Sequence, residues 1–193
     1  MTEFALDGNQ AGIDRSLKAY SHQSMRVDGV LSTSQRVRLH ARTAAIAKTR
    51  RTADFAGVAM NAVEAYGVLV QALRPERLTV PVEVARLDYA GFKLKVLMQQ
   101  GTSDWPSARV VARNASMDWS AIRKRVRDPS LQDAMDVDIA GMRRATAAGN
   151  RDMARFSADV DLALVDLLET YFEGSRRSSA LPAAGQGGAE GQP

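Results

Sequence analysis

Apolar residues recur every three or four positions between residues 35 and 174, which is the period of an amphipathic α-helix. Proline and glycine interrupt this pattern at intervals, and no stretch alternates apolar and polar residues between hairpin turns. The pattern therefore predicts an all-α protein. The predicted helices cover residues 35–74, 81–101, 105–127, 129–147 and 151–173.

Only a few residues join each of the last four predicted helices to the next. Connections this short place consecutive helices antiparallel, so we expect an antiparallel up-down helical bundle of four helices. The helix at 105–127 has the clearest apolar seam, with the heptad spacing of a coiled coil. The helix at 151–173 has a second long apolar stripe. The residues predicted to face inward on these two helices are Trp105, Ala108, Ala112, Ala115, Trp119, Ile122 and Val126, and Met153, Phe156, Val160, Leu164, Leu167 and Tyr171.

The first predicted helix, from Gln35 to Arg74, is much longer than the others. At 1.5 Å per residue it extends roughly 60 Å, against about 30 to 35 Å for each of the other four. Its N-terminal half should therefore project beyond the bundle. The alternative is a break near Thr49 to Thr52 that folds the basic half back against the acidic helix at 151–173. We expect the unbroken helix.

The chain divides into three regions by composition. Residues 1–34 are rich in Ser, Gly, Gln and Asp, and we expect a loosely ordered N-terminal arm. Residues 35–174 form the helical bundle domain. Residues 175–193 are mainly Gly, Ala, Gln and Pro, which bury too little apolar surface to offset the entropy lost on ordering, so we expect a disordered tail.

The composition removes several classes of function. The chain of 193 residues contains no cysteine, which excludes a catalytic thiol, an iron–sulfur cluster and a cysteine zinc site. It also lacks the nucleotide-binding, hydrolase, zinc-protease and EF-hand motifs. Its two histidines lie outside the predicted core. Because no catalytic motif is found, we favour a non-enzymatic protein and predict no cofactor and no metal.

Positive charge is concentrated in the N-terminal half of the long helix. Between Arg15 and Arg51 there are nine basic residues and one acid, Asp28, whereas nine acids and four arginines lie between Ser130 and Glu173. A projecting basic helix can bind another helix, an acidic surface or phosphates. We therefore predict an interaction or scaffold protein that presents this helix to a protein partner or to itself as a homo-oligomer, with nucleic-acid association as an alternative. The partner-binding candidates are Arg36, Arg38, His40, Arg42, Lys48, Arg50 and Arg51.

A second candidate site comes from carboxylates inside the apolar arcs of the predicted helices. Counted from the turn near Gly149, Asp138 and Asp161 lie at about the same height in an antiparallel hairpin. Two neighbouring carboxylates in a low dielectric need a cation or a shared proton. A cationic, metal or small ligand could bind this mid-bundle layer, although a purely structural role is the commoner outcome. The predicted layer consists of Asp88, Asp138, Asp161, Tyr66 and Arg113.

The location of the protein follows from what the sequence lacks. The first thirty residues contain no secretory signal pattern, and no stretch of 18 uncharged apolar residues is present. We therefore expect a soluble cytoplasmic protein without a membrane span. A periplasmic location is the alternative if a signal peptide has been removed.

Overall fold

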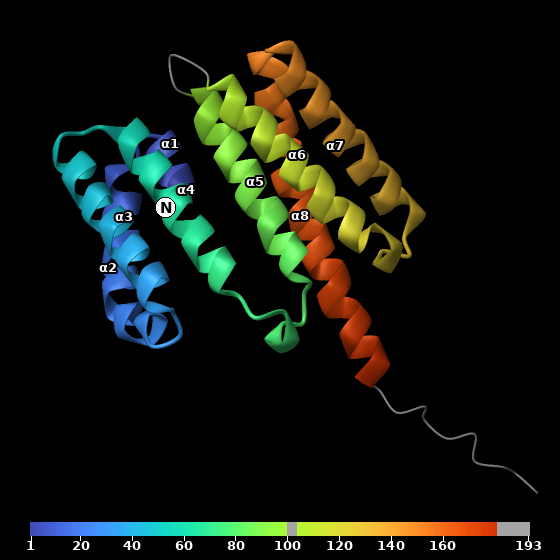
Figure 1. Ribbon diagram of the computed structural model, residues 1–193, viewed down its shortest axis with the longest axis horizontal. Helices are drawn as coiled ribbons and strands as arrows, with labels where there is room; N and C mark the ends of the chain where they lie inside the picture. The colour runs from blue at the N-terminus through green and yellow to red at the C-terminus, as the bar shows by residue number, and fades with distance from the viewer. Residues whose placement is uncertain (100–103, 181–193) are drawn as a thin grey trace, which may run out of the picture.

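The computed structural model describes residues 1–99 and 104–180, and for residues 175–180 only the backbone. The described part is helical throughout, which confirms the all-α prediction (Figure 1). Its elements are α1 (Thr2–Leu6), α2 (Gln10–Asp28), α3 (Thr33–Arg51), α4 (Phe55–Ala72), the 3-10 helix η1 (Pro75–Arg77), α5 (Val82–Gln99), α6 (Trp105–Ile122), the 3-10 helix η2 (Arg123–Arg125), α7 (Pro129–Ala148) and α8 (Arg151–Ala180).

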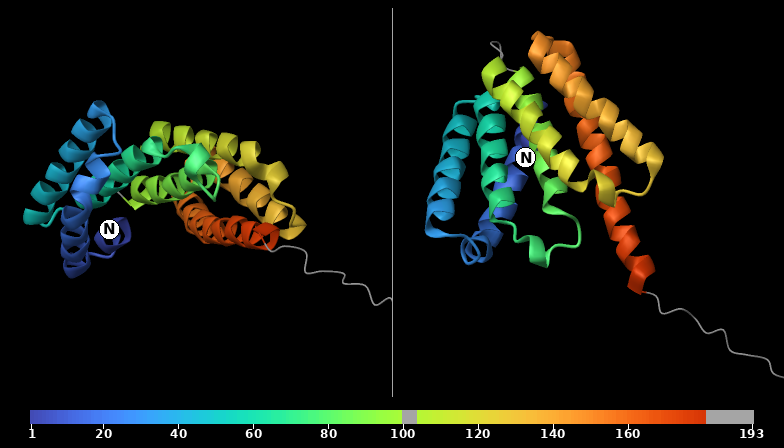
Figure 2. Two further views of the ribbon diagram at one scale, coloured as in Figure 1. Left: turned by 90° about the horizontal axis from the view of Figure 1, so that it is seen from below. Right: turned by 45° about the vertical axis from the view of Figure 1, so that its right-hand side comes forward.

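The helices share two main regions of packing. Helix α5 contacts α6 and α8, and α7 contacts the same two helices, so these four surround one hydrophobic core. Helix α4 lies between α5 and α3, and α1 packs on α4 (Figures 1 and 2). A second cluster of buried residues joins the first five helices, with Ile13, Val63 and Val96 among them. The pair α7 and α8 therefore lies at the opposite end of the molecule from α2 and α3.

The predicted inward face of the helix at 105–127 is confirmed. The seam from Ala108 to Ile122 of α6 is buried, as is Val126 after η2, and Trp105 is half-buried against the same core. Most of the helices begin where a side chain satisfies a free backbone N–H group, as the Asp104 carboxylate does for the Ser107 N–H at 3.0 Å. Buried core residues of α5 and α7 include Val84, Leu87, Leu94, Met98, Met135, Ile139 and Met142.

The predicted unbroken helix at 35–74 is wrong, because the chain turns sharply between α3 and α4. The Ala53 N–H donates to the Arg50 carbonyl at 3.2 Å and the Asp54 N–H to the Thr49 carbonyl at 3.0 Å. This is the Schellman pattern, and it requires a left-handed backbone at Ala53, whose φ is 53°. The usual glycine is absent at this position, so neither Gly nor Pro marks the break in the sequence. Helix α3 therefore folds back onto α4, and no 60 Å rod projects from the protein.

The alternative prediction, a break near Thr49 to Thr52, is right about the position of the break but wrong about the helix on which the basic half packs. The basic helix α3 packs on α4, and it pairs with acids of α2, rather than lying against the acidic helix α8. Helix α4 carries the long apolar face that α3 needs, with Val58, Val63 and Val68 all buried. Burial of apolar surface therefore determines where α3 docks, and its charges are satisfied locally.

The expectation of a loosely ordered N-terminal arm at 1–34 also differs from the structure. Helices α1 and α2 occupy this region, and Ile13 is fully buried in the second hydrophobic cluster. The Asn9 side chain caps α2 by accepting the Gly12 N–H at 2.9 Å. Few apolar residues hold α2, which is why its sequence resembles that of a mobile segment.

At the other end of the chain, α8 continues to Ala180 instead of ending before Gly174 as predicted (Figure 1). Gly174 thus lies within the helix and does not terminate it. Most of the predicted disordered tail, residues 181–193, lies outside the described residues.

The buried face of α8 is not the predicted one. Ala154, Ala158 and Val165 are buried, whereas Phe156 and Leu167 of the predicted inward stripe are 62% and 55% exposed. The two faces are separated by roughly a third of a turn. Phe156 and Leu167 therefore face away from the core, whereas Leu168 and Phe172 of the same helix are buried in it.

Helix α4 is the one helix of the described chain that is long and apolar enough to cross a membrane. The core helix of a protein that never enters a membrane meets the same criteria of length and composition. Here α4 lies between α3 and α5, with Val58, Ala59 and Val63 buried. Packing inside the protein accounts for its apolar composition, and the absence of a membrane span stays a prediction.

The turn at Ala53 gives a test of the α3–α4 hairpin. An L-residue in the left-handed conformation is strained, so Ala53→Gly should raise the free energy of unfolding by about 1 kcal/mol. Ala44→Gly is the matched control, since Ala44 is exposed in the middle of α3, and it should lower that free energy by about 1 kcal/mol. Urea unfolding measures both. A loss of stability in Ala53→Gly would show that the helix is continuous there.

Candidate functional site

Asp161 is the most deeply buried polar group of the predicted carboxylate layer. Its side chain has no exposed surface, and neither carboxylate oxygen meets a hydrogen-bond donor within the described residues. Gly91 of α5 lies directly against it, so that a Cβ at this position would come within 2.6 Å of Asp161 Oδ2. Burial raises the pKa of Asp161 well above its ordinary value, and the charges of Asp138 and Asp88 raise it further. The buried site therefore favours the protonated form of this carboxyl.

Asp138 and Asp88 lie near Asp161 on the two helices that flank α8. Asp138 of α7 is 5% exposed, its Oδ2 has no donor within the described chain, and burial raises its pKa to about 7. Asp88 of α5 is half-buried, and burial raises its pKa although the Tyr66 hydroxyl donates to its Oδ2 at 2.7 Å. The structure thus brings together three carboxyls and Tyr66, as the counting of heights predicts.

Two parts of the predicted layer differ from the structure. Arg113 lies on the exposed side of α6 and makes no contact with these carboxyls, so it does not neutralise them. The inward face of α6 at this height is occupied by Ala112 and Ala115, which left no room for a guanidinium. Nor do any three Asp, Glu, His or Cys side chains of the described chain converge closely enough to hold a metal ion. The layer is therefore a set of buried acids whose surroundings favour the protonated form, and the binding of a cation or small ligand there stays a prediction.

The basic residues of α3 form two groups. Four of them are anchored: the Arg50 guanidinium donates to both Asp14 oxygens at 2.6 and 2.5 Å, and His40 Nε2 lies 2.9 Å from Asp28. Arg38 donates to Gln71, and Arg42 lies 3.8 Å from a Glu64 oxygen. These contacts tie α3 to α2 and α4. The remaining three, which are exposed and make no ion pair among the described residues, are Arg36, Lys48 and Arg51.

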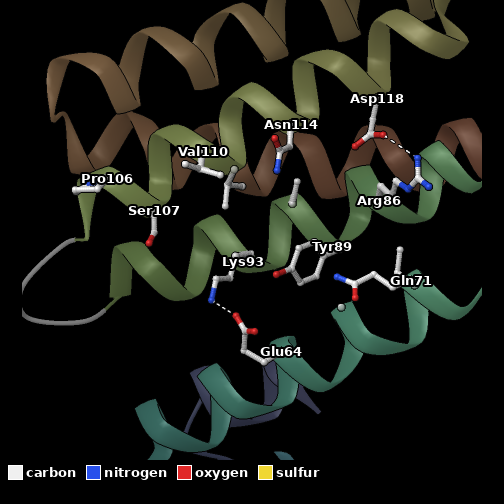
Figure 3. A pocket seen from close by; sticks show the side chains of 14 residues that line it. Glu64, Gln71, Arg86, Tyr89, Lys93, Pro106, Ser107, Val110, Asn114 and Asp118 are labelled. Carbon is white, nitrogen blue, oxygen red and sulfur yellow. Dashed lines mark hydrogen bonds and ion pairs between the residues drawn. The ribbon is translucent and has the colours of Figure 1, made fainter. Parts of the chain in front are cut away.

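A groove that the sequence does not reveal runs between α4 and α6, with α5 as its floor (Figure 3). Its volume is about 560 Å³. The close approach of α4 to α5 depends on Gly67, since a Cβ there would lie 2.7 Å from the Tyr89 ring. Two ion pairs join the floor of the groove to its walls, Lys93 of α5 with Glu64 of α4 and Arg86 of α5 with Asp118 of α6 at 3.4 Å (Figure 3). Every charged side chain that lines the groove is therefore paired. The sequence could not predict the groove, because the period of each helix does not show which polar residues of three different helices converge.

The most unusual surface of the protein lies on α7 and α8. Five apolar residues of α8 form what we call the outer stripe: Met153, Phe156, Val160, Leu164 and Leu167. Val137 of α7, which is 69% exposed, lies on the neighbouring helix of the same pair. Val160 and Leu164 are half-buried, and the other three members are exposed. The sequence signals this stripe clearly, but its period alone predicts a core face.

The buried carboxyls make stability depend on pH. Because the pKa values of Asp138 and Asp161 are raised in the folded protein, it retains protons that the unfolded chain loses near 3.8. The stability that these protons confer is complete below pH 3.8 and is lost as the pH rises through about 7 and beyond. Asp138→Asn should therefore be more stable than the wild type at pH 8, by on the order of a few kcal/mol, and the difference should vanish at pH 4. Asp161→Asn should change stability in the same direction.

Thermal melts across this pH range measure the effect. The control is Asp152→Asn in the exposed first turn of α8, which should retain the pH profile of the wild type. If the two core variants also follow the wild-type profile, the carboxyls are solvated in solution and the buried layer is wrong.

Comparison with family models, with curated proteins and with solved structures finds no match, so similarity assigns neither a family nor a function to this chain.

Proposed function

We propose that this protein is a non-enzymatic helical interaction protein that binds a protein partner through the face formed by α7 and α8. The observation that carries the proposal is the outer stripe of α8. The stripe repeats at the three-and-four spacing with which one helix packs against another. Leu164 packs partly against the core, but Met153, Phe156 and Leu167 stay exposed among the described residues. A partner helix would bury this surface.

The energetics of exposed apolar surface support the proposal. Single exposed apolar residues are normal in proteins, but a contiguous set on one face marks an interaction surface. Phe156, Leu167 and Val137 are each more than half exposed, and they lie on one helix pair. Each would contribute favourable free energy once covered, at about 25 cal/mol for every Å² removed from water. The surface is therefore matched to a partner with an amphipathic helix.

The interaction surface differs from the one expected from the sequence. The basic helix α3 does not project, and most of its candidate residues bind α2 and α4. Nucleic-acid association stays a prediction, because three cations of α3 remain exposed: Arg36, Lys48 and Arg51. Small-ligand binding also stays a prediction, and the groove beside Tyr89 supports it better than the buried carboxylate layer does.

A photo-crosslinking amino acid in place of Phe156 tests the proposal. In the organism of origin it should attach the full chain to a polypeptide, because the outer stripe is covered there. The matched control is the same substitution at Val37, which is 64% exposed on α3 and flanked by the basic candidates. Mass spectrometry identifies the products. Attachment from position 37 alone, or from neither position, would contradict the α7–α8 surface.

A further inference from the structure

We infer that the occupant of the α7–α8 face is a second copy of this chain, which packs antiparallel about a twofold axis at Val160. This inference rests on the proposed function and specifies its partner. Three independent features of the face carry it: the symmetry of the outer stripe, the height of Val137 and the charges of α7.

The outer stripe is symmetric about Val160. Met153 and Leu167 lie seven residues to either side of it, and Phe156 and Leu164 lie four residues to either side. A helix with such spacing presents the same pattern when its direction is reversed. In an antiparallel pair, Met153 therefore meets Leu167 of the second copy, Phe156 meets Leu164, and Val160 meets itself. A twofold interface requires this self-complementarity, whereas an unrelated partner does not.

Helix α7 places its own apolar residue at the same height. A Cβ at Gly141 would lie 3.3 Å from the Ser157 Oγ, which fixes the register of the antiparallel α7–α8 pair. In that register Val137 lies level with residue 161, roughly 1.5 Å along the axis from Val160. The twofold axis that relates the two α8 stripes thus also brings Val137 close to Val137 of the second copy.

The charges on the same face of α7 complement each other across this axis. Asp133, Val137 and Arg144 are spaced by four and seven residues, so they share one side of the helix, and all three are exposed. The level of Val160 corresponds to residue 138 on α7, with Asp133 about five residues to one side and Arg144 about six to the other. The axis therefore places Arg144 within about one residue of Asp133 in the second copy, and this pair occurs twice.

The alternative arrangement of two copies is less favourable. A parallel pair about an axis along the helices would carry the two α7 helices to opposite sides of the α8 pair, so that Val137, Asp133 and Arg144 would gain no partner across the interface. It would also place Phe156 against Phe156 and leave the smaller Leu164 against Leu164. A surface confined to two helices lies at the small end of specific interfaces, so we expect dissociation constants in the micromolar range.

Single cysteines test the geometry, because the natural chain has none. Under mild oxidation Val160→Cys should form a disulfide-linked dimer, since the two Cβ atoms meet at the axis. Met153→Cys alone should not link, because its copies lie about 20 Å apart, but a mixture of Met153→Cys and Leu167→Cys should form the mixed dimer. Linking of Met153→Cys to itself at the rate of Val160→Cys would overturn the antiparallel arrangement.

Sedimentation equilibrium of the full chain tests whether two copies associate and whether the pair of Arg144 with Asp133 of the second copy stabilises the dimer. The wild type should pass from monomer to dimer across the micromolar range, and Phe156→Glu should be monomeric with an unchanged melting temperature, because Phe156 is outside the core. Arg144→Asp should weaken the dimer at least tenfold, and Asp133→Arg in the same chain should restore it. Arg143→Asp, on a different side of α7, is the control and should leave the dissociation constant unchanged.

The outcomes separate this inference from the proposed function. A wild type that stays monomeric up to millimolar concentration overturns self-association. If the crosslinker at position 156 then still captures a different polypeptide, the α7–α8 face binds another protein and the proposed function stands. If it captures nothing, both are wrong.

Discussion

The close approach of α5 and α8 at Gly91 is the constraint on which the rest of the structure depends. A Cβ at Gly91 would lie 2.6 Å from Asp161 and 2.9 Å from Leu162, so these helices touch through a position that has no side chain. Helices that approach so closely need small residues on the facing side of the partner as well. Helix α8 supplies them in Ala154 and Ala158, both fully buried. The interior of this bundle is therefore matched to the small face of α8.

This choice of face determines what remains outside. Because the small residues and Asp161 occupy the core, the larger residues Phe156 and Leu167 cannot also reach it. The free energy gained by tight packing between α5 and α8 is partly offset by the burial of Asp161 without a hydrogen-bond partner. The same arrangement thus explains two features that conflict with ordinary core composition, a buried carboxyl inside the bundle and an apolar stripe outside it. An external partner for the stripe removes the second conflict.

Much of the fold and part of the candidate site could be predicted from the sequence, for reasons that differ among the helices. Helix α6 was predictable because its tryptophans and alanines all lie on one face. The proximity of Asp138 and Asp161 was predictable because the Gly149 turn fixes the heights of both. The break at Ala53 was not, because the turn uses a strained alanine where glycine is usual. The buried face of α8 was not, because size and period favour Phe156, whereas the close approach of α5 at Gly91 turns Asp161 and Leu162 of α8 toward α5.

Oxidation of the methionines by hydrogen peroxide tests most directly whether the outer stripe faces outward and is covered by a second copy. At high dilution Met153 should form its sulfoxide as fast as the exposed Met25 and Met117, and far faster than the buried Met135 and Met142. At high protein concentration Met153 alone among the exposed methionines should become protected. If Met153 reacts as slowly as Met135 at every dilution, the stripe faces the core and this account of α8 is wrong.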